Sequence, residues 1–190
     1  MFNLELPLIL ASGSPRRKEI LDLMGLSYTV DVSDADESFQ AEPDKMVMEL
    51  SRRKAAAVAP RHSDALILAA DTLVFAEHVL GKPKDADHAR CMLEELSDSW
   101  HSVYTGITLI DTRSGRTLQR ADHTRVHFCK MSAEEIEAYI ASGEPFGKAG
   151  AYAIQGIGGM FIDRIEGSYT NVVGLPMAML RDMLKQITQN

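Results

Sequence analysis

The sequence predicts an α/β protein with a mixed β-sheet, because apolar strand-like runs alternate with capped helical segments along the 190 residues. Strand patterns early in the chain are separated by helices, whereas two longer β segments follow each other late in the chain, which favours a mixed rather than wholly parallel sheet. No repeat, low-complexity tract or linker composition interrupts the pattern. We therefore expect a single domain over residues 1–190, with a largely central sheet flanked by helices.

In the first half of the chain, a short strand is followed by helices and strands in alternation. Strands are expected at residues 6–11, 28–32 and 65–70. Helices are expected from Pro15 to Gly25, from Pro43 to Ala59 and from Asp85 to about Leu96. Proline suits a first helical position and glycine the position after the last turn, and Ser14 and Asp85 can accept hydrogen bonds from first-turn N–H groups.

The second half of the chain contains the longer β segments. They are expected at residues 102–111 and 117–129, joined by a turn at 114–115. Ser132 and Glu135 form a capping box for a helix that ends at Gly143. A glycine-rich stretch, a strand and a last helix complete the pattern, at 147–159, at 160–165 and from Pro176.

Composition and charge limit the function classes. The formal net charge of −7 argues against binding a nucleic acid polymer, although local cations could still hold a small anion. The two cysteines, Cys91 and Cys129, form no CxxC motif, which favours a reducing cytoplasm over a disulfide framework. No signal peptide is recognisable, and no apolar run approaches the roughly 20 residues that span a membrane.

Two arginines at the start of the first helix are the strongest functional signal. Arg16 and Arg17 follow Ser12 and Ser14, at the helix end that already carries partial positive charge. Hydroxyls, free N–H groups and guanidinium groups together are typical of a phosphate-binding site. A capped surface helix without a ligand explains the same residues, and spacing alone leaves both interpretations open.

Asp71 and two lysines are the other candidates for chemistry. Asp71 follows the apolar run 66–70, and ligands of open α/β sheets bind outside the carboxyl ends of strands. It could bind a metal or orient a water, or it could turn the chain together with Thr72. Taken singly, Lys54 and Lys82 are best explained as solvated surface lysines. Together with Asp71 and the arginines, they indicate a site that binds an anion and a metal.

The stretch 148–156 is dense in small residues, which allow a close approach of the backbone to a ligand or to the core. Within it, Gln155 offers both a donor and an acceptor for a base edge. His123, His127 and Cys129 share one strand face by period two, but they lack a fourth zinc ligand at a standard spacing.

Several of these segments together resemble the Maf family of nucleotide pyrophosphatases. The resemblance rests on five blocks: residues 10–17, 70–72, 81–83, 148–152 and 173–176. It covers residues 8 to about 180 in order, and it departs from the family pattern at Gly147, where an acidic residue is expected. It implies a Maf/ITPase-like fold and metal-assisted hydrolysis of a nucleoside triphosphate to the monophosphate and pyrophosphate, with Mg²⁺ or Mn²⁺.

The resemblance also implies roles for individual residues. Asp71 would be the proton acceptor, and Glu37 would join it near the metal. Lys82 would belong to the catalytic set and hold phosphate. The other implied phosphate ligands are Ser12, Arg17 and Lys54, and the residues implied in substrate choice are Arg16, Thr72 and Gln155.

Within the family, Gly13 and the stretch 148–156 resemble the branch that acts on dTTP and UTP. Whether this chain acts on the canonical nucleotides or on modified pyrimidine nucleotides is left open by the sequence. The alternatives are a 7-methyl-GTP pyrophosphatase and a nucleotide-binding regulator of septum formation without significant turnover. The resemblance also makes a homodimer plausible.

Overall fold

The computed structural model of the chain describes residues 4–188, which divide into two compact units. The first unit is built from residues up to Asp71, from 105–122 and from Gly174 onward. The second unit is built from 72–104 and 123–173. Each unit has its own packed interior and its own share of the candidate site residues.

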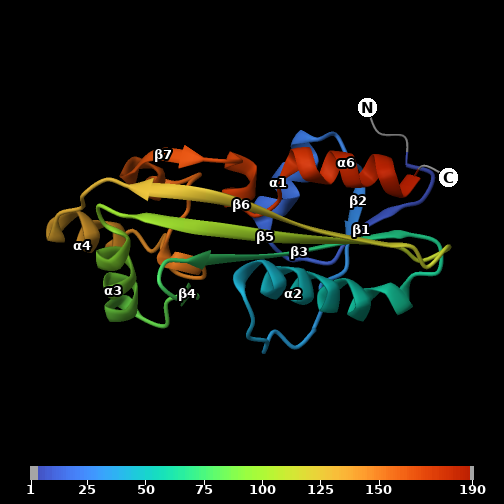
Figure 1. The fold of residues 1–190 in the computed structure, drawn as a ribbon, viewed down its shortest axis with the longest axis horizontal. Helices are drawn as coiled ribbons and strands as arrows, with labels where there is room; N and C mark the ends of the chain where they lie inside the picture. The colour runs from blue at the N-terminus through green and yellow to red at the C-terminus, as the bar shows by residue number, and fades with distance from the viewer. Residues whose placement is uncertain (1–3, 189–190) are drawn as a thin grey trace. The chain divides into compact units, whose positions relative to one another are not determined.

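The strands are β1 (Leu8–Leu10), β2 (Tyr28–Val30), β3 (Leu66–Phe75), β4 (Val79–Leu80), β5 (Trp100–Asp111), β6 (Thr117–Phe128) and β7 (Ile162–Glu166). The helices are α1 (Pro15–Leu23), α2 (Pro43–Val58), α3 (Ala86–Leu96), α4 (Ala133–Ala141), α5 (Tyr169–Val173) and α6 (Met177–Thr188). Short 3₁₀ helices are η1 (Ala59–Arg61), η2 (Ala149–Ala151) and η3 (Ile157–Phe161). Figure 1 shows these elements along the chain.

The strands form one seven-stranded sheet in the order β2-β1-β3-β5-β6-β7, with β4 paired to β3. β1 pairs in parallel with β2 and β3, whereas β3 with β4 and β6 with β7 pair antiparallel. The predicted α/β fold with a mixed sheet flanked by helices is therefore confirmed. Single-domain behaviour over residues 1–190 and a homodimer stay predictions.

Two parallel strands of the first unit, β1 and the first part of β3, are buried on both faces, as their apolar sequences predict, whereas β2 at the edge is partly exposed. Ile9, Ile67 and Ala69 share a cluster with Ala55 and Val58 of α2. In Figure 1, α2 lies on one side of this part of the sheet, and α1 and α6 lie on the other. Burial on both sides fixes the strands that carry the first candidate residues.

The position of Asp71 differs from the prediction, because β3 continues to Phe75 and Asp71 lies inside the strand rather than at its end. Leu73 and Val74 are buried, and pairing with β4 extends the ladder. The sequence predicts a strand over residues 65–70 only. The neighbouring strand β1 does end early, and the Ala11 N–H donates to the Leu68 carbonyl at 2.8 Å. Asp71 therefore lies beyond the carboxyl end of β1.

Helix ends were predicted with mixed success. Ser14 occupies the N-cap position of α1 but makes no capping hydrogen bond with its side chain, so that part of the prediction is wrong. Asp85 caps α3 by accepting from the His88 N–H, and Ser132 with Glu135 forms the predicted capping box. The last strand begins at Ile162 rather than at residue 160, because η3 occupies the preceding residues.

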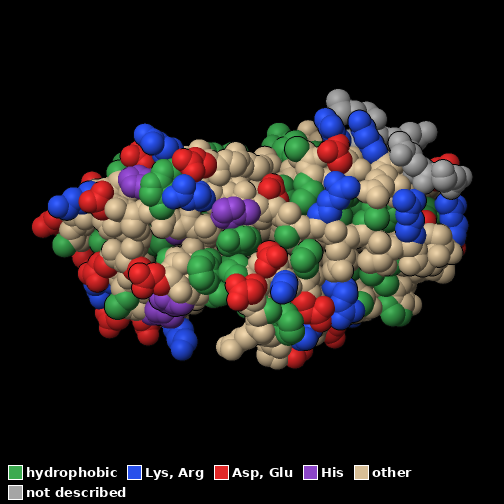
Figure 2. All heavy atoms as spheres, viewed as in Figure 1, with side chains coloured by type: hydrophobic (Ala, Val, Ile, Leu, Met, Phe, Trp, Pro, Cys, Tyr) green, Lys and Arg blue, Asp and Glu red, His purple; other side chains and the backbone are tan. Residues whose placement is uncertain are grey.

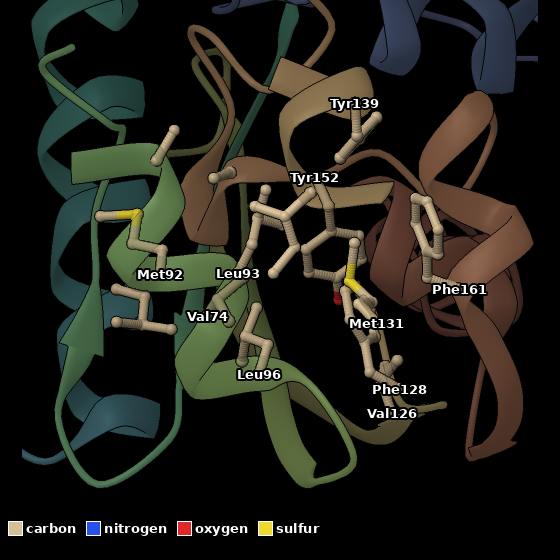
Figure 3. Packing of buried hydrophobic residues seen from close by; sticks show 14 of the residues in the cluster. Val74, Met92, Leu93, Leu96, Val126, Phe128, Met131, Tyr139, Tyr152 and Phe161 are labelled. Atoms are coloured by element: carbon tan, nitrogen blue, oxygen red, sulfur yellow. The ribbon is translucent and has the colours of Figure 1, made fainter. Parts of the chain in front are cut away.

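The core of the second unit is rich in aromatic rings (Figure 3). Tyr152 is 6% exposed and packs edge-on against Phe128, with ring centroids 4.9 Å apart. His101 lies in the same core at 3% exposure and shares a hydrogen bond of 2.8 Å with the Tyr152 hydroxyl. The Nδ1 atom of His101 has no hydrogen-bond partner among residues 4–188. Sequence analysis missed this histidine, since nothing in its neighbours marks it as buried.

Burial of His101 should make the protein less stable in mild acid. Burial, with a smaller effect of His127, lowers the pKa of His101 from 6.5 to about 4. The unfolded chain therefore binds a proton in this range while the folded chain does not. The contribution of neutral His101 to the free energy of unfolding is full above pH 6.5 and is lost progressively as the pH falls toward 4. Urea titrations should show a loss of about 2 kcal/mol between about pH 7.5 and about pH 5 from this ring alone. A His101→Gln variant with the same pH dependence as the wild type would contradict the assignment.

The surface is mixed in charge. Figure 2 shows acidic and basic side chains interspersed on the face drawn. This distribution agrees with the modest net charge of −7, and it provides no broad positive field on that face for a polyanion. Among residues 4–188, the helices are all too short or too polar to cross a membrane.

Candidate active site

Asp71 and Lys54 meet because of the way β3 packs on α2. Asp71 follows Ile67 and Ala69 at two-residue intervals, so all three side chains leave the same face of β3. That face packs on α2, in which Lys54 precedes the buried Ala55. The Lys54 Nζ donates a hydrogen bond to Asp71 Oδ1 at 2.5 Å, and both side chains are about nine-tenths buried. The structure thus joins two residues that the sequence identified separately.

Glu37 is a second carboxylate on the same lysine. Its Oε1 lies 3.1 Å from the Lys54 Nζ, and its side chain is 62% exposed. The acidic loop offers other carboxylates, but Asp34 and Asp36 pair with arginines instead. Lys54 therefore bridges one buried carboxylate and one exposed carboxylate, and the predicted role of Glu37 near a metal stays a prediction.

Arg53 holds the loop that carries Glu37, and sequence analysis did not identify this role. The Arg53 Nη1 donates to the backbone carbonyls of Asp36 and Ser38, at 3.4 and 3.3 Å. Its guanidinium also lies 5.1 Å from the centre of the Phe39 ring. These contacts flank Glu37 on both sides. The signal in the sequence was the position of Arg53 directly before Lys54, on the helix that the loop enters.

Arg17 and Ser12 bind each other at the start of α1. The Arg17 Nη1 donates to Ser12 Oγ at 2.9 Å, and its Nε donates to the Gly174 carbonyl at 3.0 Å. Ser12 is 7% exposed and also accepts from the Ser14 N–H at 3.3 Å. The guanidinium is therefore held in place by protein contacts on two sides. The sequence marks Gly174 only as part of the block 173–176. Its carbonyl contact with Arg17 depends on how the chain folds.

Electrostatic coupling places Arg17 near the two carboxylates. Burial lowers the pKa of Arg17, and this effect is opposed by Asp71 and Glu37 and reinforced by the neighbouring Arg16. Arginine stays protonated in proteins even so. The first unit therefore gathers two cations and two carboxylates beyond the end of β1. Such a set can bind an anion and place a carboxylate next to it.

The other candidates lie in the second unit. Thr72 is in β3, Lys82 is exposed in the turn after β4, and Gln155 is exposed between η2 and η3. The Gly150 N–H donates to the Gly81 carbonyl at 3.1 Å, which ties the turn before Lys82 to the small-residue stretch. Their predicted convergence with Asp71 on one substrate stays a prediction.

The carboxylates of Asp71 and Glu37 suit a hard divalent cation. Among the described residues, no three histidine, cysteine or acidic side chains cluster as in a closed metal site. Mg²⁺ in phosphate-processing enzymes commonly uses one or two carboxylates, water and the substrate phosphates. The Lys54 ammonium contacts both carboxylates. Their spacing therefore accommodates a positive charge between them. The residues fit a metal that binds together with its substrate.

The fold and this site define an α/β protein with a carboxylate–lysine pair beyond the end of a parallel strand and a basic helix start beside it. Residues 7–187 match the family described as Maf-like protein, and the chain belongs to the Maf family. The resemblance predicted from the motifs is confirmed.

Three curated relatives of similar length share the name dTTP/UTP pyrophosphatase. The chain is 46% identical over 186 residues to a dTTP/UTP pyrophosphatase of Pelotomaculum thermopropionicum, covering 96% of this chain and 97% of the relative. It is 46% identical over 182 residues to a protein of the same name from Bacillus cereus, covering 94% of each. A third, from Halalkalibacterium halodurans, is 47% identical over 182 residues, covering 94% of this chain and 95% of the relative.

Proposed function

We propose that this protein is a nucleoside triphosphate pyrophosphatase that hydrolyses dTTP and UTP to the monophosphate and pyrophosphate. The observation that carries the proposal is the buried Asp71–Lys54 pair beside Arg17, within a chain of the Maf family. A binding protein needs the cations but has no use for a carboxylate base among them. The names of full-length relatives support both the reaction and the pyrimidine substrates.

In the proposed reaction, a water oxygen attacks the α-phosphorus in line with the bond to the bridging oxygen. The new P–O bond forms as the α–β bridging bond breaks, and pyrophosphate leaves with the bonding electrons. Asp71 accepts the proton that the water loses. Its Oδ1 is held by Lys54. Lys54 and Arg17 offset the charge on the phosphoryl oxygens.

A divalent metal is part of the proposal. Asp71 and Glu37 are the residues that would hold Mg²⁺ or Mn²⁺. When bound, the metal would neutralise charge on the phosphate oxygens.

The remaining phosphate contacts are proposed from the family resemblance. Ser12, Ser14 and Arg17 would hold phosphate, and so would Lys82. Arg16 and Thr72 would contribute to nucleotide choice, together with Gln155.

Gln155 is the proposed reader of the pyrimidine. Its side-chain amide carries one acceptor and two donors. Uracil and thymine present an N–H donor beside a carbonyl acceptor, so an amide can pair with them through two hydrogen bonds. Cytosine reverses both groups, and an amide held in one orientation would reject it.

Pyrophosphate release from a panel of triphosphates tests the proposed function. The panel contains dTTP, UTP, CTP, GTP and 7-methyl-GTP, each assayed with Mg²⁺, with Mn²⁺ and with a chelator. We expect dTTP and UTP to react fastest, and we expect the chelator to abolish turnover. Preference for 7-methyl-GTP would instead support the other branch of the family. Nucleotide binding without turnover on any member would support a regulator of septum formation.

A further inference from the structure

Two side chains outside the proposed catalytic set grip the backbone around Gln155. They are Tyr139, in α4, and Glu144, in the loop that follows α4. This loop continues through η2 and η3 to β7 and carries Gln155 at an exposed position. We refer to Tyr139 and Glu144 as the clamp.

Glu144 holds the loop on the carboxyl side of Gln155. Its Oε2 accepts from the Ile157 N–H at 2.9 Å, and its Oε1 accepts from the Gly158 N–H at 2.9 Å. The same Oε1 accepts from the Tyr139 hydroxyl at 2.8 Å. A single carboxylate therefore fixes two consecutive peptide N–H groups and is itself fixed by a buried phenol.

Tyr139 holds the loop on the amino side of Gln155. Its hydroxyl accepts from the Ala153 N–H at 3.3 Å while donating to Glu144. Tyr139 is 1% exposed and packs against Phe161, with ring centroids 5.5 Å apart (Figure 3). The clamp thus holds the backbone two residues before Gln155 and two and three residues after it, and it is anchored in the core of the second unit.

Two glycines of the loop show how closely the clamp fits. A Cβ at Gly156 would lie 2.1 Å from the Glu144 carboxylate, and a Cβ at Gly158 would lie 2.5 Å from the Tyr139 hydroxyl. Neither position leaves room for a side chain larger than hydrogen. The glycines are therefore needed for close approach to the clamp.

The surroundings keep Glu144 ionised and Tyr139 protonated, which are the states that the hydrogen bonds of the clamp need. Partial burial opposes ionisation of Glu144, but the Gly158 and Ile157 N–H groups, Tyr139 and the charge of Lys148 outweigh it and lower the pKa of the carboxyl group. Burial, followed by the hydrogen bond to Glu144, raises the pKa of Tyr139. At neutral pH the carboxylate is an acceptor only and the phenol keeps its proton, as these hydrogen bonds require.

We propose that Tyr139 and Glu144 are positioning residues that set the pyrimidine preference by fixing the backbone that presents Gln155. The inference rests on the proposed function, because it takes Gln155 as the reader of the base. Two hydrogen bonds from one amide require a fixed distance and angle. A loop released on either side of Gln155 lets the amide sample positions that accept cytosine as well as uracil.

The experiment measures the ratio of kcat/KM for UTP to that for CTP in the Tyr139→Phe and Glu144→Gln variants. Tyr139→Phe keeps the ring and removes the hydroxyl, and Glu144→Gln keeps the shape but gives up one acceptor atom. We expect each variant to lower the UTP/CTP ratio by about tenfold. The kcat on UTP should fall much less.

The Gln155→Ala background separates positioning from general support of the fold. If the clamp acts through Gln155, neither substitution changes the UTP/CTP ratio further once Gln155 is alanine. Tyr104→Phe and Glu94→Gln are matched controls in the same unit and should keep the wild-type ratio. The Tyr104 hydroxyl and the Glu94 carboxylate make no hydrogen bond within residues 4–188.

The outcomes are distinct. A wild-type enzyme without preference for UTP over CTP refutes the proposed function. A selective wild type whose clamp variants keep the UTP/CTP ratio, or lose both activities equally, refutes the positioning role alone. If circular dichroism shows Tyr139→Phe to be unfolded, Glu144→Gln decides by the same criteria. If both variants are unfolded, the clamp serves folding rather than selectivity and the inference is overturned.

Discussion

Replacing Asp71 with asparagine should lower kcat on dTTP by about a thousandfold, the scale of a lost general base. Asparagine has nearly the same shape and can still accept the hydrogen bond from Lys54, so β3 and α2 should pack as before. What it lacks is an oxygen that can take the proton from water. The residue is 7% exposed, which leaves little bulk solvent to substitute for it.

The decisive test of Asp71→Asn compares its effect on kcat with its effect on the affinity for dTTP. Pyrophosphate release gives kcat, and calorimetric titration with dTTP gives the dissociation constant, which should change by less than about tenfold. Asp64→Asn, at an exposed site, is the matched control and should keep full activity. A rate for Asp71→Asn within about tenfold of the wild type would remove Asp71 from the role of proton acceptor.

Much of the fold was accessible from the sequence because its signals are local. Apolar runs such as 66–70 become buried parallel strands, and the Ser132–Glu135 capping box acts over three residues. The limits of β3 were not accessible. Its continuation past Asp71 depends on pairing with β4, a strand of two residues that no periodicity can mark.

The candidate site was accessible as a set of residue types but not as contacts. The sequence identified Lys54 and Asp71, yet their hydrogen bond depends on how α2 seats on the sheet. Arg53 and the clamp residues were missed for the same reason. Their partners are backbone atoms whose positions exist only in the folded chain, as with Glu144 and the N–H groups of 157–158.

Replacing Gly106 with alanine should lower the free energy of unfolding by about 3 kcal/mol, at the upper end for overpacked sites. The reason is the close packing of α2 on β5. A Cβ at Gly106 of β5 would lie 2.4 Å from the Val47 carbonyl oxygen and 2.8 Å from the Met48 nitrogen. Both atoms belong to the backbone of α2, which cannot rotate aside as a side chain can. The helix would have to lift from the strand.

Other contacts at the same place resist that movement. The Gln119 Nε2 donates to the Met48 carbonyl and to Thr108 Oγ1, both at 3.1 Å. The hydroxyls of Ser51 and Thr108 share a hydrogen bond of 2.9 Å in the buried interface. Lifting α2 strains these bonds in addition to the apolar packing, so relaxation cannot remove the whole cost of the added methyl group.

Urea titration of Gly106→Ala measures the loss, with Gly81→Ala as the control because a Cβ there has no neighbour within 4 Å. The control should stay within about 0.5 kcal/mol of the wild type. Because α2 also carries Lys54, Gly106→Ala should lose turnover even where it remains folded, through displacement of the lysine from Asp71. A Gly106→Ala protein with wild-type stability would mean that α2 can leave β5 without cost. The close backbone contact would then have no part in placing Lys54.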